Sequence, residues 1–172
     1  MKQRVAVMAL AGWIGAVANP LWAAEPVELS TRVSGVVETV WVKPGQRVKK
    51  GSPLLRLDRT ILQASLAEAT AELTRAQADA GEARRERERA QELFNRTVSS
   101  TSELDAAVLL DARAQAGLAV AKARRVIAQK NLQDAELKAP FDGVVKAVPG
   151  GPGTVVTAEC QPKPLVIFST AP

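Results

Sequence analysis

The sequence predicts an α+β fold: a small β-sandwich built from two sequence halves, with a long antiparallel α-helical coiled-coil hairpin inserted between them. Three observations predict it. Glycine and proline are dense at both ends of the chain but almost absent from the middle. The middle has helix-forming composition and a heptad pattern of apolar residues. The two ends repeat one another, as sandwich halves would.

The composition argues against an enzyme. The 172 residues contain no His and a single Cys, so imidazole chemistry and an internal disulfide are excluded. The sequence shows no phosphate-binding loop, no paired carboxylates and no cluster of metal ligands. We therefore expect no catalytic residues, no bound metal and no cofactor. Positive and negative side chains alternate along residues 84–89, which indicates a solvated helix face and not a basic patch. The net charge of +5 is therefore no reason to expect a nucleic-acid partner.

Residues 1–24 resemble a signal peptide. Lys2 and Arg4 precede an apolar run of 14 residues, which ends before Asn19-Pro20. Such a run is too short to span a bilayer as a stable helix. We expect cleavage after Ala23 or Ala24 and export to the periplasm, with an inner-membrane anchor as the outcome if the signal stays uncleaved.

The halves of the predicted sandwich are residues 25–59 and 137–172. Residues 35–40 match residues 143–148 at an offset of 108, and Gly45 and Gly153 keep the same offset. The runs 53–57 and 164–168 also correspond, after a slip of three residues. Both copies are rich in Val and punctuated by turns. Because neither half is long enough to bury its own apolar face, we expect the two halves to pair.

Residues 60–136 form the predicted hairpin. They include 19 Ala among 77 residues, a composition that favours helix. One apolar seam runs from Leu62 to Phe94 and a second from Leu104 to Ala135. Between them, Ser100 begins a capping box that Glu103 completes. The tip of the hairpin is therefore placed at about residues 95–100.

The breaks in the two seams predict which residues face each other. If Phe94 lies opposite Leu104, the charged interruptions Arg87 and Asp111 also lie opposite each other. We therefore predict an interhelical ion pair between Arg87 and Asp111. Such a pair adds little stability, because desolvation opposes the attraction, but it disfavours slipped pairings.

These features together resemble a known family. Residues 35–58 and 137–145, flanking a helical hairpin, are similar to the lipoyl-like (barrel-sandwich hybrid) domain of periplasmic adaptor subunits, the membrane fusion proteins of the HlyD/RND efflux type. At the tip, Arg89, Leu93 and Ser100 have the spacing of the motif with which such adaptors contact a TolC-like outer-membrane channel.

The resemblance implies an adaptor of a tripartite efflux or secretion system that functions in transmembrane transport. It implies a TolC-like outer-membrane channel as one partner and an inner-membrane transporter of RND or ABC type as the other. It also implies a homo-oligomer, a hexameric ring in this family. The family's residues for channel contact correspond to Arg89, Leu93 and Ser100.

Two alternatives stay open at this point. Adaptors of this family normally continue into a β-barrel that contacts the pump, whereas this chain ends at Pro172; a truncated adaptor without pump binding is therefore one alternative. The other is a lipoyl- or biotinyl-type carrier subunit of an enzyme, which shares the sandwich. A carrier presents one Lys between the halves, and no Lys occurs from residue 51 to residue 121.

Overall fold

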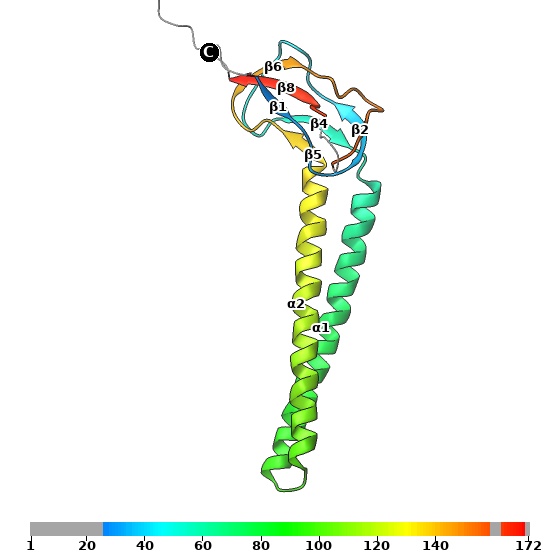
Figure 1. The fold of residues 1–172 in the computed structure, drawn as a ribbon, viewed down its shortest axis with the longest axis vertical. Helices are drawn as coiled ribbons and strands as arrows, with labels where there is room; N and C mark the ends of the chain where they lie inside the picture. Colours follow the sequence, from blue (N-terminus) through cyan, green and yellow to red (C-terminus); the bar gives the residue numbers. More distant parts are fainter. Residues whose placement is uncertain (1–25, 159–162, 171–172) are drawn as a thin grey trace, which may run out of the picture.

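The computed structural model describes residues 26–158 and 163–170. A small β-sandwich lies at one end of the molecule, and a two-helix hairpin projects from it (Figure 1). Strands from both ends of the sequence form the sandwich, so the predicted fold class is confirmed. The predicted signal peptide, residues 1–24, lies outside the described residues.

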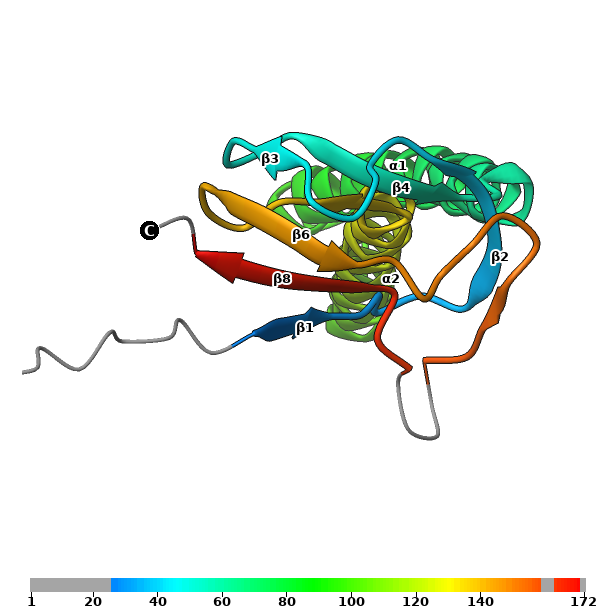
Figure 2. The same ribbon diagram turned by 90° about the horizontal axis from the view of Figure 1, so that it is seen from above.

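The sandwich consists of two four-stranded sheets (Figure 2). One has the order β1-β8-β6-β3 and the other the order β5-β4-β2-β7. The strands before the hairpin are β1 (Val27–Leu29), β2 (Gly35–Val40), β3 (Arg47–Val48) and β4 (Pro53–Leu57). Those after it are β5 (Glu136–Lys138), β6 (Gly143–Ala147), β7 (Val155–Val156) and β8 (Val166–Thr170). All the pairings are antiparallel.

The sequence repeat appears as an exchange of short strands between the halves. β3 of the first half pairs with β6 of the second, and β7 of the second pairs with β2 of the first. The two repeated glycines act alike: Gly45 donates to Val145 O and Gly153 donates to Val37 O, each with a φ of 85°. This positive φ suits glycine because it has no Cβ. Each half thus completes a sheet of the other.

The core lies between the two sheets. Its largest fully buried side chains come from both halves: Phe168, Leu54, Leu55, Leu57, Leu165, Val37, Val145 and Val166. Because β4 and β8 supply most of this set from opposite ends of the sequence, neither half has a core without the other.

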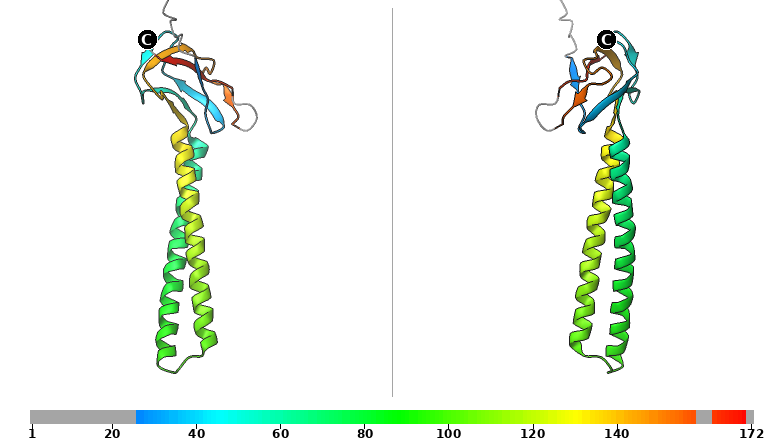
Figure 3. Two further views of the ribbon diagram at one scale, coloured as in Figure 1. Left: turned by 60° about the vertical axis from the view of Figure 1, so that its left-hand side comes forward. Right: turned by 90° about the vertical axis from the view of Figure 1, so that its right-hand side faces the viewer.

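The hairpin consists of α1 (Thr60–Asn95) and α2 (Thr101–Asp134), which lie side by side along their length (Figure 3). The seam between them is built mainly of buried alanines: Ala76, Ala80, Ala83, Ala90, Ala107 and Ala121. Such small side chains let two helices approach closely but bury little apolar area per turn. Within the described residues, neither helix has a stretch long and apolar enough to cross a membrane.

The domain limits predicted from the sequence, 25–59, 60–136 and 137–172, stay a prediction. Helix α1 begins after Asp58, whose carboxylate accepts hydrogen bonds from the N–H and the hydroxyl of Thr60. These bonds lower the pKa of Asp58. The two chain connections to the sandwich hold the base of the hairpin, so the tip is the part most distant from the core (Figure 1).

Candidate functional site

The candidate site is the tip of the hairpin, where α1 turns into α2. Helix α1 ends in a Schellman motif, in which Val98 N–H donates to Leu93 O and Thr97 N–H donates to Phe94 O. Thr97 occupies the left-handed position with a φ of 61°, which is unfavourable for a β-branched residue. The motif brings Val98 back beside the last turn of α1.

Helix α2 begins with the capping box predicted from the sequence. Ser100 Oγ accepts from the N–H of Glu103 at 3.3 Å, and Glu103 Oε2 accepts from the N–H of Ser100 at 2.9 Å. Ser99 Oγ donates to the same carboxylate at 2.6 Å. Both bonds lower the pKa of Glu103, and the bond from the Ser99 hydroxyl contributes more than the bond from the Ser100 N–H. The turn is therefore held by polar contacts on both sides.

A hollow of about 550 Å³ opens between the two helices beside this turn. Its lining is mostly apolar and includes Ala90, Leu93, Val98, Ala106, Ala107 and Leu110, with Glu86, Ser99 and Glu103 as its polar members. The side chains of Leu93 and Val98 are large for such exposed positions, with 45% and 73% of their surface accessible. Exposed apolar side chains around a hollow are typical of a docking surface. We call this feature the tip hollow.

The three residues predicted for channel contact lie around the tip hollow in different ways. Leu93 lines it directly. Arg89 forms an ion pair with Glu86, a lining residue, through its Nε at 3.1 Å and through Nη2. Ser100 does not line it, and its hydroxyl is engaged in the capping box. The structure thus brings Leu93 and the partner of Arg89 together and places Ser100 at the adjoining helix start.

Val98 and Leu110 belong to this surface but were not predicted from the sequence. Val98 is an apolar residue within the otherwise polar segment 95–99, which was a usable signal. Leu110 lies next to the seam residue Asp111 in the run Val108-Leu109-Leu110, so that its side of the helix could not be assigned from hydrophobicity alone.

The predicted register pair lies near the tip. Arg87 Nε is 3.4 Å from Asp111 Oδ2 across the seam. The Asp111 side chain is only 11% exposed, and its other oxygen accepts from Gln115 Nε2 at 3.4 Å. The carboxylate therefore has partners on both helices.

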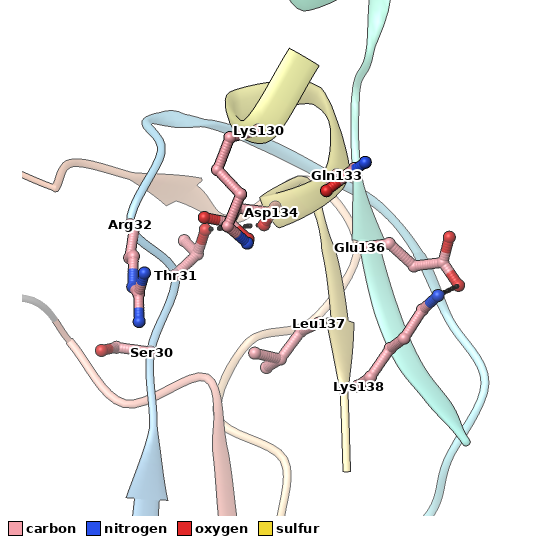
Figure 4. A pocket seen from close by; sticks show the side chains of 9 residues that line it. All are labelled: Ser30, Thr31, Arg32, Lys130, Gln133, Asp134, Glu136, Leu137 and Lys138. Carbon is pink, nitrogen blue, oxygen red and sulfur yellow. Dashed lines mark hydrogen bonds and ion pairs between the residues drawn. The ribbon is translucent and has the colours of Figure 1, made fainter. Parts of the chain in front are cut away.

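A second hollow, of about 590 Å³, lies at the opposite end of the hairpin, between the segment after β1, the end of α2 and β5 (Figure 4). Its charged groups largely pair with each other: Lys130 with Asp134, and Lys138 with Glu136 at 3.6 Å. Thr31 Oγ1 donates to Asp134 O at 3.3 Å. Of these contacts, only the bond from Thr31 joins the end of α2 to the sandwich, because the two ion pairs lie within α2 and within β5. Across residues 26–158 and 163–170, no group of carboxylate or Cys side chains could hold a metal ion.

Comparison with known proteins gives consistent matches. Residues 25–161 match the family described as CzcB-like, barrel-sandwich hybrid domain. The multidrug resistance protein MdtA of Cronobacter turicensis is 30% identical over 158 residues, which cover 87% of this chain and 38% of MdtA. The efflux pump periplasmic linker BepF of Brucella suis is 33% identical over 145 residues, which cover 84% of this chain and 35% of BepF. The chain thus spans less than half the length of these relatives.

Solved structures agree in both fold and sequence. A putative efflux transporter from Bacteroides eggerthii superimposes with a TM-score of 0.63 at 28% identity, over 86% of this chain and 40% of that protein. A MacA–MexA chimeric protein, which contains the α-hairpin domain of Pseudomonas aeruginosa MexA, has a TM-score of 0.63 at 26% identity, over 85% of this chain and 46% of the chimera.

Proposed function

Because this chain belongs to the CzcB-like barrel-sandwich hybrid family of periplasmic adaptor (membrane fusion) proteins, which are not enzymes, we propose that it is an adaptor of a tripartite efflux or secretion system. In this role it couples an inner-membrane transporter to a TolC-like outer-membrane channel. The expected location is the periplasm, as for BepF, which is named a periplasmic linker. Membership of an adaptor family also argues against the alternative of a lipoyl or biotinyl carrier.

The tip hollow is the observation that carries the proposal. It lies at the end of the hairpin farthest from the sandwich, where Leu93 and Val98 are exposed to solvent. Exposed apolar side chains at the end of a long, narrow projection are suited to contact a partner tip to tip. The groove between two helices accepts side chains from another helical segment, as in other helix-in-groove complexes.

The polar residues of the motif support the same docking. The Arg89 guanidinium is exposed and held by Glu86 at the rim of the hollow, so it is oriented without being buried. Ser100 keeps the start of α2 fixed through the capping box. We therefore assign Leu93 to apolar contact, Arg89 to polar contact at the rim, and Ser100 to the shape of the tip.

The test is capture of a TolC-like channel by the chain immobilised on a support. Leu93→Ser and Ser100→Asp are expected to abolish capture while the far-ultraviolet circular dichroism of the hairpin is unchanged. The first change removes the apolar contact. The second keeps the helix start, because Asp is itself a good N-cap, but places a negative charge on the exposed tip where the channel would dock. Ile61→Ser is the control, because Ile61 is also an exposed apolar residue but lies at the base of the hairpin, away from the tip hollow. Undiminished capture by Leu93→Ser would contradict the proposed docking surface.

The same proposal gives the chain a second partner, an inner-membrane transporter of RND or ABC type. It is tested by crosslinking in membranes, with one photoreactive group at the tip and another in the sandwich. Recovery of both a channel and a transporter is expected. Recovery of a channel alone would favour the truncated adaptor without pump binding.

A further inference from the structure

The positive charge of the molecule is concentrated in the sandwich. Residues 60–134, which contain both helices, have eleven basic and eleven acidic residues, so the hairpin carries no net charge. The described residues of the sandwich have ten basic residues and five acidic ones. A net positive charge gathered at one end of a long molecule attracts an anionic partner to that end.

Half of the basic residues of the sandwich form one exposed group, at the edge of a sheet where β3 pairs with β6. We call this group the basic patch, and its members are Lys43, Arg47, Lys49, Lys50 and Lys146. Among the described residues, none of the five forms an ion pair within the chain. Asp142 is the only acidic residue in segments 42–52 and 139–148. The patch therefore keeps most of its charge available for a partner.

The pairing of β3 with β6 brings two of these side chains together on the outward face of the sheet. Arg47 lies opposite Val144, so their side chains leave the sheet on the same side. Lys146 lies two residues after Val144 and is exposed, whereas Val145 between them is fully buried in the core. Because successive side chains of a strand alternate between its faces, Arg47 and Lys146 share the face that points to solvent.

Two turns extend the patch along β6 in both directions. The turn that begins with Lys43 is bonded to the middle of β6, since Val145 N–H donates to Gln46 O at 3.0 Å. The turn after β3 is bonded to the residue before β6, since Lys50 N–H donates to Asp142 Oδ1 at 2.6 Å. Backbone contacts thus hold both turns, and with them their lysines, beside the same strand.

The basic patch lies at the end of the molecule opposite the tip. The sheet that carries it, β1-β8-β6-β3, covers the side of the sandwich away from the hairpin (Figure 1, Figure 2). The pairings of β1 with β8, β8 with β6 and β6 with β3 are all antiparallel. The start of β1 therefore lies at the same end of the sheet as the turn after β3. The chain thus enters the sandwich from residues 1–24, with their apolar run, at the end of the sheet that carries this part of the patch.

The composition of the patch favours lipid headgroups over a protein partner. Four of its five residues are Lys, which is depleted at protein–protein interfaces and carries a strongly hydrated ammonium group on a flexible stem. No large apolar side chain is exposed in the described segments 42–52 and 139–148, whereas protein interfaces centre on apolar and aromatic side chains. A surface of anionic phospholipids requires no apolar contact, because it attracts clusters of Lys and Arg through charge.

We propose that the basic patch binds the phosphate groups of anionic phospholipids, so that the sandwich lies against a membrane surface. The choice of membrane, the periplasmic side of the inner membrane, rests on the proposed adaptor function, whereas the lipid binding itself does not. Because the patch and the tip are at opposite ends of the molecule, the hairpin then points away from the membrane. The tip hollow stays free for a channel.

The proposal is tested by co-sedimentation of the full 172-residue chain with phospholipid vesicles. Vesicles of phosphatidylcholine with about 30% phosphatidylglycerol present an anionic surface, and vesicles of phosphatidylcholine alone present a neutral one. The affinity for the anionic vesicles is expected to be about tenfold higher or more at low salt. It is expected to fall several-fold in about 0.5 M NaCl, because salt screens the attraction.

The variant Arg47→Glu/Lys146→Glu reverses two charges of the patch. It is expected to lower the affinity for the anionic vesicles about tenfold or more, with an unchanged melting temperature because both side chains are exposed. The matched control is Arg113→Glu/Lys122→Glu, which makes the same change in net charge at exposed positions of α2. This control is expected to keep its affinity. Residues 1–24 are the same in all these chains, so the difference between the variants reports on the patch.

Three outcomes would overturn the proposal: equal losses of affinity for the two double variants, equal binding to anionic and neutral vesicles, or no binding to anionic vesicles. The last would leave an acidic protein surface as the partner of the patch. Leu93→Ser is expected to bind vesicles normally, because Leu93 lies at the other end of the molecule. Loss of channel capture with intact vesicle binding would contradict the channel function alone, whereas loss of vesicle binding with intact capture would contradict this inference alone.

Discussion

Arg87 and Asp111 contact each other across the hairpin seam, with Arg87 Nε 3.4 Å from Asp111 Oδ2. The two partners are unequally buried, since the Arg87 side chain is 43% exposed and the Asp111 side chain 11%. Among the described residues, its buried neighbours along the seam are alanines, which offer the carboxylate no polar partner. The carboxylate is therefore the member that depends on its partner, because the guanidinium keeps much of its contact with water.

Removal of Arg87 is expected to destabilise the hairpin. Arg87→Ala leaves the buried Asp111 carboxylate without its cation and is expected to cost about 1–2 kcal/mol of unfolding free energy. The double variant Arg87→Leu/Asp111→Leu replaces the pair with apolar side chains and is expected to recover the loss. Urea unfolding followed by circular dichroism measures both.

The control for this pair is Arg84→Ala. Arg84 lies on the exposed face of the same helix, with its Nε 3.8 Å from Glu88 Oε1, and exposed pairs of this kind contribute little. Equal losses for Arg87→Ala and Arg84→Ala would show that Asp111 does not depend on the ion pair.

Replacement of Thr97 by Gly is expected to stabilise the chain. Thr97 has a φ of 61° at the position of the Schellman motif where glycine is preferred. Its Cβ makes this conformation costly, so Thr97→Gly is expected to raise the unfolding free energy by up to about 1 kcal/mol. Thr97→Asn should give a smaller gain, because Asn tolerates this region better than a β-branched residue does. Thermal unfolding provides the measurement. A lower melting temperature for Thr97→Gly than for the chain with Thr97 would argue against strain at this turn.

Gly143→Ala is expected to disrupt the sandwich. A Cβ on Gly143 would lie 2.2 Å from Ser169 O and 2.8 Å from the Phe168 ring, and the carbonyl of β8 cannot move without breaking the sheet. Overpacking of this kind typically costs about 1–3 kcal/mol, and backbone contacts place this case at the upper end.

Gly35 is the repeat equivalent of Gly143 and serves as its control. A Cβ there would lie 3.4 Å from Leu57 Cδ1, which is close to an ordinary van der Waals contact and requires no backbone movement. Gly35→Ala is therefore expected to unfold at a higher urea concentration than Gly143→Ala. The reverse order would mean that the close approach of β6 to β8 is not a constraint.

Acid is expected to loosen the tip through Glu103. The Ser99 hydroxyl and the Ser100 N–H lower the pKa of this carboxyl in the folded chain. A carboxyl whose pKa is lower in the folded chain stabilises the fold at pH values above its pKa in the unfolded chain, which is about 4.3 for Glu. That stabilisation is lost as the pH falls through the pKa of the folded chain. Hydrogen exchange of the Ser100 amide should therefore lose protection as the pH falls below about 4.

The variant Glu103→Gln separates this effect from general acid unfolding. Gln can still accept from the Ser100 N–H but carries no charge, so the protection of that amide should no longer change with pH in this range. Unchanged pH dependence in Glu103→Gln would assign the loosening to another group.

The sequence alone determined those parts of the molecule that depend on local periodicity. Heptad spacing specified the two helices and their seams, and the Ser100–Glu103 pattern specified where α2 begins, because a capping box needs only four consecutive residues. The sequence also named Arg87 and Asp111 as facing residues, and they lie 3.4 Å apart in the structure. It named Leu93 at the tip through a motif of fixed spacing.

Only the tertiary structure decided which strands exchange partners and which side chains surround the tip hollow. The repeat implied two pairing halves, but it could not place β3 beside β6 or β7 beside β2, because two-residue strands carry no periodicity that specifies a partner. The tip hollow depends on Val98, which reaches Leu93 through a turn with Thr97 in a conformation that its residue type disfavours. Local preference opposes that turn, so only the closure of the two helices against each other could determine it.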